Sequence, residues 1–554
     1  GIPDAHLVAV VDPMGDLLAR FARTHGPFTA EEVAADLGLP IGVLTQMLHG
    51  MVTSGALLRG EFRPGGSGQE YCERDVLRRI RRSSVAKLRE EIEPVDMTDY
   101  SPFVLQWNGV QTIDASANAA PAGIDETAAA LDRLSALVVP ASSVLALLRA
   151  RIPAAGLGDI DTLLASGALT WWGHGSLGSR DMTIAWAPRA IAAEVRSMLK
   201  GSEPTPRTEL APTALAIVEA LSGGGAFDSD AIHASLVRVG TVVSLETVES
   251  TLWELAAGGW VTSDSWTALH ERVSGRRRAT EQRPAARSRA RSRSPRRTRM
   301  VVRSGGPRWS LAAGAASAVG HSTANSTANS TAANGITESA ALEYAGILLE
   351  RWAVASRVSV AAEQPVGGFA GQYRVLSALA EAGSCQRVYA VDGAGGAQFA
   401  VNGAVDALRE VSSDLQQGRF LLSAIDPAQP FGTLLSWPDT KTSEKSNAPR
   451  PARRAGALVL LDGAALRAYV EPSGSSLATW AVESDDAASA LLSDIARARE
   501  PMTNRPRALL TAIDGISLLD GAAISSDGAV RWNVAITAAG FTPTPRGWRW
   551  PTYA

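Results

Sequence analysis

The chain has 554 residues, of which 45% are hydrophobic, and this is enough for several globular domains of about 100–200 residues each. Its two cysteines, Cys72 and Cys385, are too few for a disulfide framework or a cysteine-rich zinc site, and they fit a reducing cytoplasm. The formal net charge is −3, and no run of 18 apolar residues occurs, so we expect no membrane partner.

Three helices and a hairpin are predicted in the first 66 residues. The helices are expected over 13–24, 30–37 and 40–53. Thr29 and Glu32 have the spacing of a capping box at the start of the second helix. The turn Pro64-Gly65-Gly66 then follows an apolar strand. Three helices followed by a hairpin are typical of a winged helix.

A basic helix is predicted over 75–92. Its basic side chains are Arg78, Arg79, Arg81, Arg82, Lys87 and Arg89. They form either a solvated helix face or a set of contacts to DNA phosphates, and the sequence leaves both open.

The helix, glycine, strand pattern recurs along the chain. Each predicted helix ends at a glycine that can take the left-handed conformation, and a short apolar strand follows. The glycines are Gly55, Gly167, Gly259, Gly383 and Gly540. Comparable units fit residues 130–185, 208–270 and 340–402.

The third helix of each unit matters because it would enter the major groove of DNA. The helices predicted around 157–166 and 245–257 carry acidic residues, so we expect scaffold or protein-contact roles for them. The helix over 368–382 instead offers Gln372, Tyr373 and Arg374 as DNA-contacting residues, although a plain structural helix is an equal alternative.

Residues 274–335 interrupt the repeated pattern. The stretch 276–299 holds eleven arginines and one acid, Glu281, and a Ser-Thr-Ala-Asn repeat follows near 322–329. Such composition cannot bury enough apolar surface to form a core, so a disordered linker is predicted. Its arginines would also suit a DNA-binding arm without sequence preference.

Short apolar strands dominate after residue 412. Strands are predicted over 418–424, 455–461, 466–471 and 477–482, followed by helices over 485–498 and 505–513. Several short strands separated by turn signals suggest a small β-barrel.

The predicted fold class is therefore α+β, with four to five tandem winged-helix domains and a small β-barrel module. The expected divisions are winged helix 1 with the basic helix (1–95), winged helix 2 (96–203), winged helix 3 (204–273), the linker (274–335), winged helix 4 (336–412), the barrel (413–484) and a C-terminal winged-helix-like module (485–554).

Three residues are candidates for chemistry. Asp392 and Gln398 flank a glycine-rich wing, and Asp426 begins the segment Asp426–Gly432 near the predicted barrel. A carboxylate or an amide in such a place could activate a water molecule. Ordinary turn chemistry is the competing explanation for each of these segments.

Several catalytic motifs are absent. The sequence contains no GxxxxGK[ST] phosphate loop and no DExH box, so we expect no ATP hydrolysis by this chain alone. Its seven histidines show no HExxH spacing, and we expect neither a metal site nor a cofactor.

Taken together, the motifs resemble the large helicase-related (Lhr) proteins of bacteria, most closely actinobacterial or mycobacterial ones. The segments that carry the resemblance are His25–Thr29, Gly60–Gly66, Arg78–Arg82, Leu105–Val110, Pro140–Ser142, Pro307–Leu311, Gly367–Phe369, Gly395–Phe399, Asp426–Gly432, Gly540–Phe541 and Pro545–Gly547.

The resemblance implies that a superfamily 2 helicase core, which moves 3′ to 5′ on DNA using ATP, precedes this chain in a longer DNA-repair protein. The chain would then be its C-terminal extension, and its start at Gly1 fits a fragment. The extension is similar in architecture to DNA glycosylases built from winged helices and a β-barrel. Their Gln-x-Gln or Gln-x-Asp pair does not occur here.

Three functions follow as hypotheses. The first is a DNA-binding and assembly region, in contact with single-stranded or duplex DNA, with further copies of itself and with the helicase core, in the cytoplasm at the nucleoid. The second is a DNA glycosylase, for example one acting on uracil, which would use Asp392, Gln398 and Asp426. The third is a transcription regulator, which would need basic recognition helices.

Overall fold

The computed structural model describes residues 12–63, 69–80, 94–117, 123–275, 306–315, 337–411, 418–440, 448–503, 507–519, 523–525 and 528–552. The chain divides into two compact units, residues 1–94 and 95–554. None of the helices described here is long and apolar enough to cross a membrane.

Unit 1 has the element order expected of a winged helix. Its elements are α1 (Pro13–Thr24), β1 (Phe28–Thr29), α2 (Ala30–Leu37), α3 (Ile41–Thr53), β2 (Leu57–Gly60), β3 (Glu70–Glu73) and a helix over 74–80. The strands form an antiparallel sheet in the order β1-β3-β2. The helices predicted over 13–24, 30–37 and 40–53 are confirmed within a residue at each end, and the helix predicted over 75–92 is described only over 74–80.

Local chemistry explains where the helices of unit 1 begin. The Thr29 side chain accepts a hydrogen bond from the Glu32 backbone N–H, and the Glu32 carboxylate accepts one from the Thr29 N–H, so the predicted capping box is present. Leu18, Val33 and Leu44 are fully buried between the three helices and form the core. Burial of such side chains is the main force that holds a domain this small together.

The first module of unit 2 packs helices against a hairpin. Its elements are α5 (Met97–Trp107), α6 (Ile113–Ala117), α7 (Ile124–Arg133), β4 (Val139–Pro140), the 3-10 helix η2 (Ala141–Ser143), α8 (Val144–Arg149), α9 (Leu157–Ser166), β5 (Leu169–Leu177), β6 (Asp181–Pro188) and α10 (Ala192–Ser197). The strand order is β4-β6-β5. Trp171, Trp172 and Trp186 of the hairpin are fully buried.

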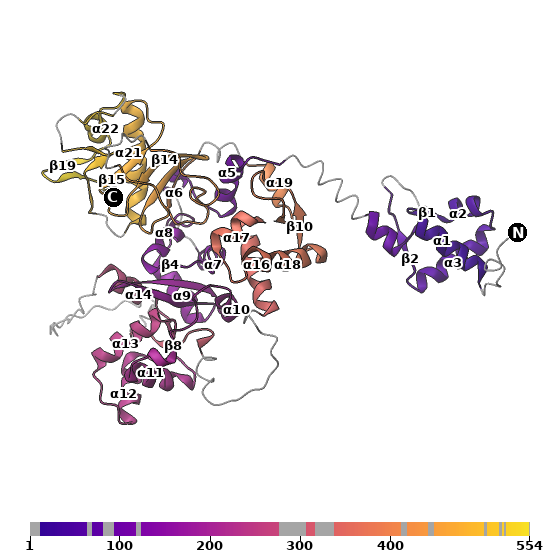
Figure 1. The fold of residues 1–554 in the computed structure, drawn as a ribbon, viewed down its shortest axis with the longest axis horizontal. Helices are drawn as coiled ribbons and strands as arrows, with labels where there is room; N and C mark the ends of the chain where they lie inside the picture. The colour runs from indigo at the N-terminus through magenta and orange to yellow at the C-terminus, as the bar shows by residue number, and fades with distance from the viewer. Residues whose placement is uncertain are drawn as a thin grey trace, which may run out of the picture. The chain divides into compact units, whose positions relative to one another are not determined.

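The next module is a bundle of helices with a short sheet (Figure 1). Its elements are η3 (Arg207–Glu209), α11 (Pro212–Ser222), α12 (Ser229–Arg238), α13 (Leu245–Ala257), β7 (Val261–Ser263), α14 (Trp266–Ser274) and β8 (Trp309–Leu311). Strand β8 pairs with β7 in antiparallel register and buries Trp309.

This pairing corrects one part of the predicted linker. Residues 274–335 were expected to lack structure, but 306–315 return to complete the sheet of the third module. The aromatic ring of Trp309 is the reason, because it packs against Trp253 with ring centroids 4.7 Å apart. The arginine-rich stretch 276–299 and the repeat near 322–329 lie outside the described residues.

The module predicted as winged helix 4 also has the element order expected of a winged helix. Its elements are α16 (Glu338–Trp352), β9 (Val354–Ser356), α17 (Arg357–Glu363), α18 (Gly368–Ala382), β10 (Cys385–Val388), β11 (Gln398–Val401) and α19 (Ala404–Arg409). The sheet order is β10-β11-β9, and all pairs are antiparallel.

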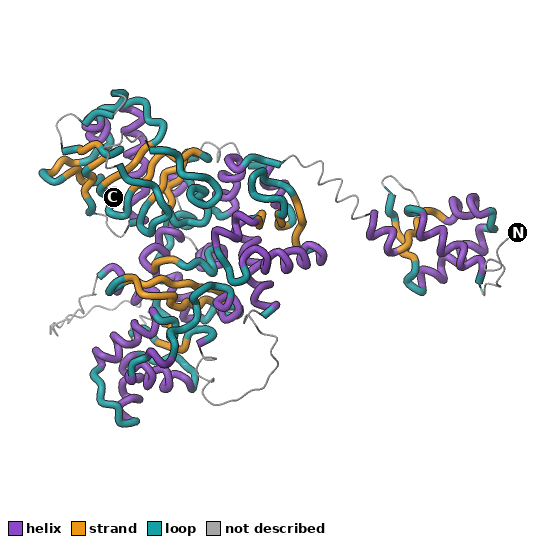
Figure 2. The backbone as a smooth tube through the Cα atoms, viewed as in Figure 1, coloured by secondary structure: helices purple, strands orange, loops and turns teal. Residues whose placement is uncertain are grey.

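The predicted barrel is not confirmed. Among the described residues there is an open six-stranded sheet in the order β12-β13-β14-β15-β17-β18, and no pairing joins its edge strands. Figure 2 draws the strands of the chain in orange. The strands are β12 (Arg419–Ser423), β13 (Leu458–Asp462), β14 (Ala465–Val470), β15 (Ser476–Thr479), β17 (Ala512–Ile513) and β18 (Ile516–Ser517).

The C-terminal module combines helices with a small sheet of its own. Its elements are α21 (Asp485–Arg499), the 3-10 helix η4 (Glu500–Met502), β16 (Leu509–Leu510), α22 (Trp532–Ala538), β19 (Thr542–Thr544) and β20 (Gly547–Arg549). Its strands pair in the order β16-β20-β19.

The helix predicted over 505–513 is wrong. Leu509 and Leu510 pair with β20, while Ala512 and Ile513 pair with β15 in parallel. An apolar run this short does not distinguish a helix from a strand by its periodicity, and here its two halves pair with strands of two different sheets.

The glycine pattern that marked the units is confirmed. Gly55, Gly167, Gly259, Gly383 and Gly540 have φ angles of 76°, 77°, 75°, 82° and 81°. All five therefore adopt the left-handed conformation that ends a helix and starts a strand.

A buried ion pair joins the first module of unit 2 to α16 and α17. Arg351 is 1% exposed, forms an ion pair with Glu363, and donates hydrogen bonds to the carbonyls of Arg133, the last residue of α7, and of Ser135 just after it. Tyr344 and Trp352 donate to the same Glu363 carboxylate at 3.2 and 2.6 Å. A buried charge is tolerated only when an opposite charge lies beside it, as Glu363 does here.

A close backbone approach fixes the bundle against the hairpin. A Cβ atom at Gly173 in β5 would lie 1.9 Å from the carbonyl oxygen of Ala256 at the end of α13. Only glycine therefore allows α13 to rest on the hairpin at this point.

We predict that Gly173→Ala destabilises unit 2 by about 1–3 kcal/mol, because the methyl group forces α13 away from β5. Gly223→Ala is the matched control, since a Cβ there meets nothing within 4 Å and φ is −70°. Urea unfolding followed by tryptophan fluorescence measures both. Equal midpoints for the two variants would contradict the packing described here.

Candidate nucleic-acid interface and a neighbouring pocket

A winged helix that binds DNA presents its third helix to it, and the third helix of the module of residues 337–411 is α18. It starts after Gly367, ends at Gly383, and buries Leu376 against the core beside α16. Of the three predicted contact residues on it, Arg374 is exposed, Tyr373 is half-buried and Gln372 is fully buried.

Gln372 lies inside the module. It is 0% exposed, and neither its amide nitrogen nor its amide oxygen has a hydrogen-bond partner among the described residues. A buried amide without partners costs free energy. Contact between Gln372 and DNA stays a prediction, and it requires the side chain to leave this position.

The ring of Tyr373 lies between Phe399 and the guanidinium group of Arg387. Its ring packs edge-on against Phe399 with centroids 5.7 Å apart, and the guanidinium of Arg387 lies 5.7 Å from its centroid. Arg387 is exposed on β10 and was not singled out in the sequence. Arg374 and Arg387 thus place two exposed positive charges on and beside α18.

The wing that follows β10 is held by Gln398. This side chain is fully buried: its oxygen accepts from the N–H groups of Ala390 and Val391 at 3.0 Å, and its nitrogen donates to the carbonyls of Val391 and Gly395. Both donors and both lone pairs of the amide are used inside the wing.

Asp392 lies exposed at the tip of the wing. Its carboxylate accepts from the Tyr389 hydroxyl at 2.7 Å and from the Gly393 N–H at 2.9 Å. The hydrogen bond from the Tyr389 hydroxyl to Asp392, together with the negative charge of Asp392, raises the pKa of Tyr389. The backbone of the wing is also paired with Val95, whose N–H donates to Ala390 at 2.9 Å.

Asp426 belongs to a different place in the fold. It is 0% exposed and forms a two-bond ion pair with Arg151, at 2.8 and 3.0 Å, and it accepts from the Ala428 N–H. It shares no hydrogen bond or ion pair with Asp392 or Gln398. A catalytic role for these three residues stays a prediction, and the fold does not bring them together through direct contacts.

In unit 1, Arg78 and Arg79 lie on the helix over 74–80. Arg78 is exposed and pairs with Asp75 at 2.8 Å, while Arg79 donates to the carbonyl of Arg23 at 3.3 Å. Arg81 and Arg82, together with the rest of the predicted basic helix, lie outside the described residues. The exposed Arg78 is compatible with either interpretation of this helix.

The two acidic third helices, α9 and α13, make contacts within the chain. Asp161 of α9 accepts hydrogen bonds from the backbone N–H groups of Trp266 and Thr267, and from the Thr267 hydroxyl at 2.5 Å. It therefore caps the start of α14, and this part of α9 contacts protein. In the same way, the C-terminal end of α13 rests on β5.

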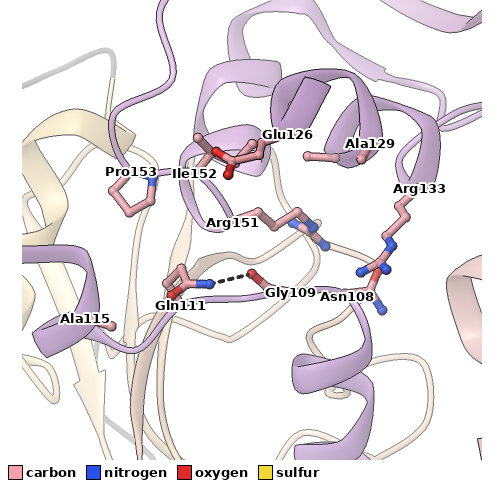
Figure 3. A pocket seen from close by; sticks show the side chains of 11 residues that line it. Asn108, Gly109, Gln111, Ala115, Glu126, Ala129, Arg133, Arg151, Ile152 and Pro153 are labelled. Atoms are coloured by element: carbon pink, nitrogen blue, oxygen red, sulfur yellow. Dashed lines mark hydrogen bonds between the residues drawn. The ribbon is translucent and has the colours of Figure 1, made fainter. Parts of the chain in front are cut away.

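A pocket of about 430 Å³ opens between α5, α7 and the end of α8 (Figure 3). Arg151 lies in the middle of it, with Gln111, Glu126 and Arg133 around it. The sequence analysis did not find this pocket, because its residues come from separate helices with no common motif.

We predict that Asp426→Asn destabilises unit 2 by about 3–5 kcal/mol, since it leaves the Arg151 guanidinium buried without its counter-charge. The exposed Asp392→Asn is the matched control and is expected within about 0.5 kcal/mol of the parent chain. Urea unfolding by tryptophan fluorescence reports on both. If the Asp426→Asn chain were as stable as the parent chain, Asp426 would have no structural role, and a chemical role would be favoured.

A second prediction concerns pH and unit 1. Hydrogen bonds from the Arg63 side chain and the Phe62 N–H hold the pKa of Glu70 below its ordinary value of 4.5. A lowered folded pKa means that the charged form stabilises unit 1 above about pH 4.5, and that this stabilisation is lost as the pH falls through the folded pKa.

Glu70→Gln should therefore weaken unit 1 strongly at pH 7 and much less near pH 3. All 14 tryptophans lie beyond residue 94, so hydrogen exchange of peptides from β1 to β3 is the suitable measurement. Glu61→Gln, at an exposed position, is the control. A difference between Glu70→Gln and the parent chain that is independent of pH would refute the role given to Glu70.

Comparison with known proteins places these features in a family. A family model described as "Large helicase-related protein, winged-helix domain" matches residues 335–420, and a second model with the same description matches residues 95–189. These are the two modules that contain α18 and the pocket, so winged-helix domains are confirmed there. The total number of such domains stays a prediction.

Two curated relatives match 99% of the chain. The protein of Mycolicibacterium smegmatis named "Lhr helicase/ probable uracil glycosylase" is 35% identical, and that of Escherichia coli named "Lhr helicase/uracil glycosylase" is 28% identical. The chain spans about a third of the length of each, since the matches cover 34% of both. Two modules of this chain are therefore winged-helix domains of the large helicase-related (Lhr) family, and over 99% of its length the chain is similar to Lhr proteins, with a match of the kind expected for the C-terminal region of one.

Proposed function

We propose that this chain is the DNA-binding region of an ATP-dependent 3′-to-5′ DNA translocase in DNA repair, and that the ATPase motor lies outside it. The observation that carries the proposal is the exposed pair Arg374 and Arg387 on and beside α18 of a winged-helix domain. Arginine side chains on such a helix are suited to DNA phosphates and to base edges. Both relatives are named as helicases, and this supports the proposal that an ATPase motor lies outside this chain.

We predict that replacing both arginines, Arg374→Ala with Arg387→Ala, weakens binding to a labelled 20-mer DNA about tenfold or more at low salt. Each lost phosphate contact should also reduce the slope of log affinity against log salt by about one. Fluorescence anisotropy at several salt concentrations measures both effects, on single-stranded and duplex DNA.

Arg238→Ala is the matched control, because Arg238 is exposed at the end of α12, away from α18 in the sequence. A further variant with glutamines in place of the eleven arginines of 276–299 measures the contribution of that segment. If this variant alone abolishes binding and the double variant binds like the parent chain, the role of α18 is refuted.

Self-association and the cytoplasmic, nucleoid location belong to the same proposal. Acidic third helices suggested protein contacts. Asp161 of α9 is used within the chain, whereas Glu246, Glu249 and Glu254 of α13 are exposed. A second copy would therefore bind at the exposed face of α13 and not at Asp161. Light scattering at micromolar concentration tests it, and a monomeric mass removes self-association from the proposal.

Base excision is not the function that this geometry favours, although both relatives carry uracil glycosylase in their names. Of the three candidate residues, Gln398 uses its whole amide to hold the wing, and Asp426 is enclosed with Arg151. Incubation with a uracil-containing strand, followed by hot alkali, tests excision directly, and cleavage that survives Asp392→Asn would assign it to other residues.

A further inference from the structure

We infer that a small cavity beside Arg149 binds a single phosphate group. The cavity has a volume of about 170 Å³ and is lined by residues of α6, α8, β12, α21 and η4. Gln111 and Pro153 separate it from the larger pocket around Arg151, since these two residues line both. Binding of free phosphate does not depend on the proposed function, whereas binding of a phosphate at the end of a DNA strand rests on it.

Arg149 is a half-buried cation without a counter-charge. Its Nη1 donates to the Pro501 carbonyl at 2.7 Å and its Nε to the Ala155 carbonyl at 3.4 Å, whereas its Nη2 has no partner among the described residues. Burial lowers the pKa of Arg149, and no carboxylate of the described residues opposes that shift. A cation removed from water is costly unless an anion lies beside it. Arg149 therefore lacks the kind of partner that Asp426 supplies to Arg151.

A ligand in the cavity can reach the unused nitrogen of Arg149. This side chain lines the cavity, and its Nη2 keeps exposed surface. Arg196 provides the contrast, because its Nη2 also lacks a partner but is fully enclosed by protein. Only the guanidinium of Arg149 thus combines an unused donor with access from the cavity.

Two further side chains add donors to the cavity. Arg497 on α21 is 39% exposed, and among the described residues only its Nη2 is engaged, with Asp114 at 3.0 Å and Asp494 at 2.9 Å. The pair with Asp114 is weak in water, since the Asp114 side chain is 84% exposed. The Ser116 hydroxyl on α6 also lines the cavity and has no partner among the described residues. Together with Arg149 these groups can surround an oxyanion.

The charges around the cavity favour an anion. Arg149 and Arg497 line it, and no acidic residue is among the residues that line it. Asp494 also pairs with Arg419, so three arginines (149, 419 and 497) face two aspartates (114 and 494), which leaves one positive charge. Guanidinium groups match the geometry of phosphate oxygens and bind them through charge-assisted hydrogen bonds.

The size of the cavity selects a small ligand. A volume of about 170 Å³ corresponds to roughly six water molecules at about 30 Å³ each, and it lies below the range of about 300–1,000 Å³ that is usual for drug-sized ligands. A phosphate group fits this space, whereas a whole nucleotide does not. The apolar side chains of Ile113, Leu421 and Met502 are buried on its wall, and they limit the screening of charge by water.

The test uses Ala498→Glu, because Ala498 of α21 lines the cavity and is half-buried. The added carboxylate repels phosphate and offers Arg149 a counter-charge, so binding should be lost while the fold is kept. Ala490→Glu, at an exposed position of the same helix, is the matched control. Arg149→Met removes the cation itself, and Arg238→Met at an exposed position is the control for that change.

Inorganic phosphate is the first probe, and its line width in phosphorus NMR is followed at constant ionic strength. The parent chain and both controls should broaden the line in a saturable way. Ala498→Glu and Arg149→Met should bind phosphate at least about tenfold more weakly. Phosphate bound by the arginines of 276–299 is common to all these chains and cancels in the comparison. Circular dichroism checks the fold of Arg149→Met, and if that variant is unfolded, Ala498→Glu decides.

Two labelled single strands that differ only at the 5′ end distinguish the sources of the phosphate. If the parent chain binds the 5′-phosphate strand at least about threefold more tightly than the 5′-hydroxyl strand, and Ala498→Glu abolishes this difference, the strand end occupies the cavity. If the two strands bind equally while inorganic phosphate binds the cavity, the ligand is free phosphate.

Separate outcomes decide the two proposals. Phosphate binding that is absent, or that is equal in Ala498→Glu and Ala490→Glu, refutes the cavity as a phosphate site while binding of both strands leaves the proposed function standing. If the parent chain binds neither strand, the proposed function is refuted, and the titration with inorganic phosphate alone decides the cavity.

Discussion

The buried ion pair between Arg351 and Glu363 is the interaction on which the arrangement of unit 2 depends. It ties α16 and α17 to the end of α7, and the Arg351 carbonyl also holds Asn108 at the end of α5. Both charges of the pair are buried, so removing one member would leave the other uncompensated. The floor and one wall of the pocket are therefore positioned by the same network that joins the two family-matched modules.

A second buried pair extends this principle to the six-stranded sheet. Arg151 follows α8 and Asp426 follows β12, so their ion pair fastens the sheet to the first module of unit 2. Arg453 covers the same segment by donating to the carbonyls of Ile425 and Asp426 at 3.0 and 2.9 Å. The acid that looks catalytic in the sequence is thus also a structural counter-ion, which is a common role for a fully buried carboxylate.

Local signals were read correctly where local chemistry decides the outcome. The Thr29–Glu32 capping box, the left-handed glycines and the long amphipathic helices depend only on neighbouring residues. Expectations failed where distant segments compete. Residues 509–513 became two strands because β20 and β15 accept them, and Trp309 returned from a predicted linker to the sheet of the third module. The candidate site shows the same division, since Arg374 was found as an exposed charge and the burial of Gln372 was not.

By itself the sequence determined the repeated helix and strand units, the family resemblance and the exclusion of a phosphate loop, because these depend on spacing and residue type along the chain. Only the tertiary structure decided that the sheet after residue 412 has unjoined edges among the described residues, that α9 and α13 serve internal contacts, and that Asn108, Arg133 and Arg151 share one pocket. The physical reason is that burial and charge pairing are properties of segments brought together in space, and periodicity along one segment carries no record of its partners.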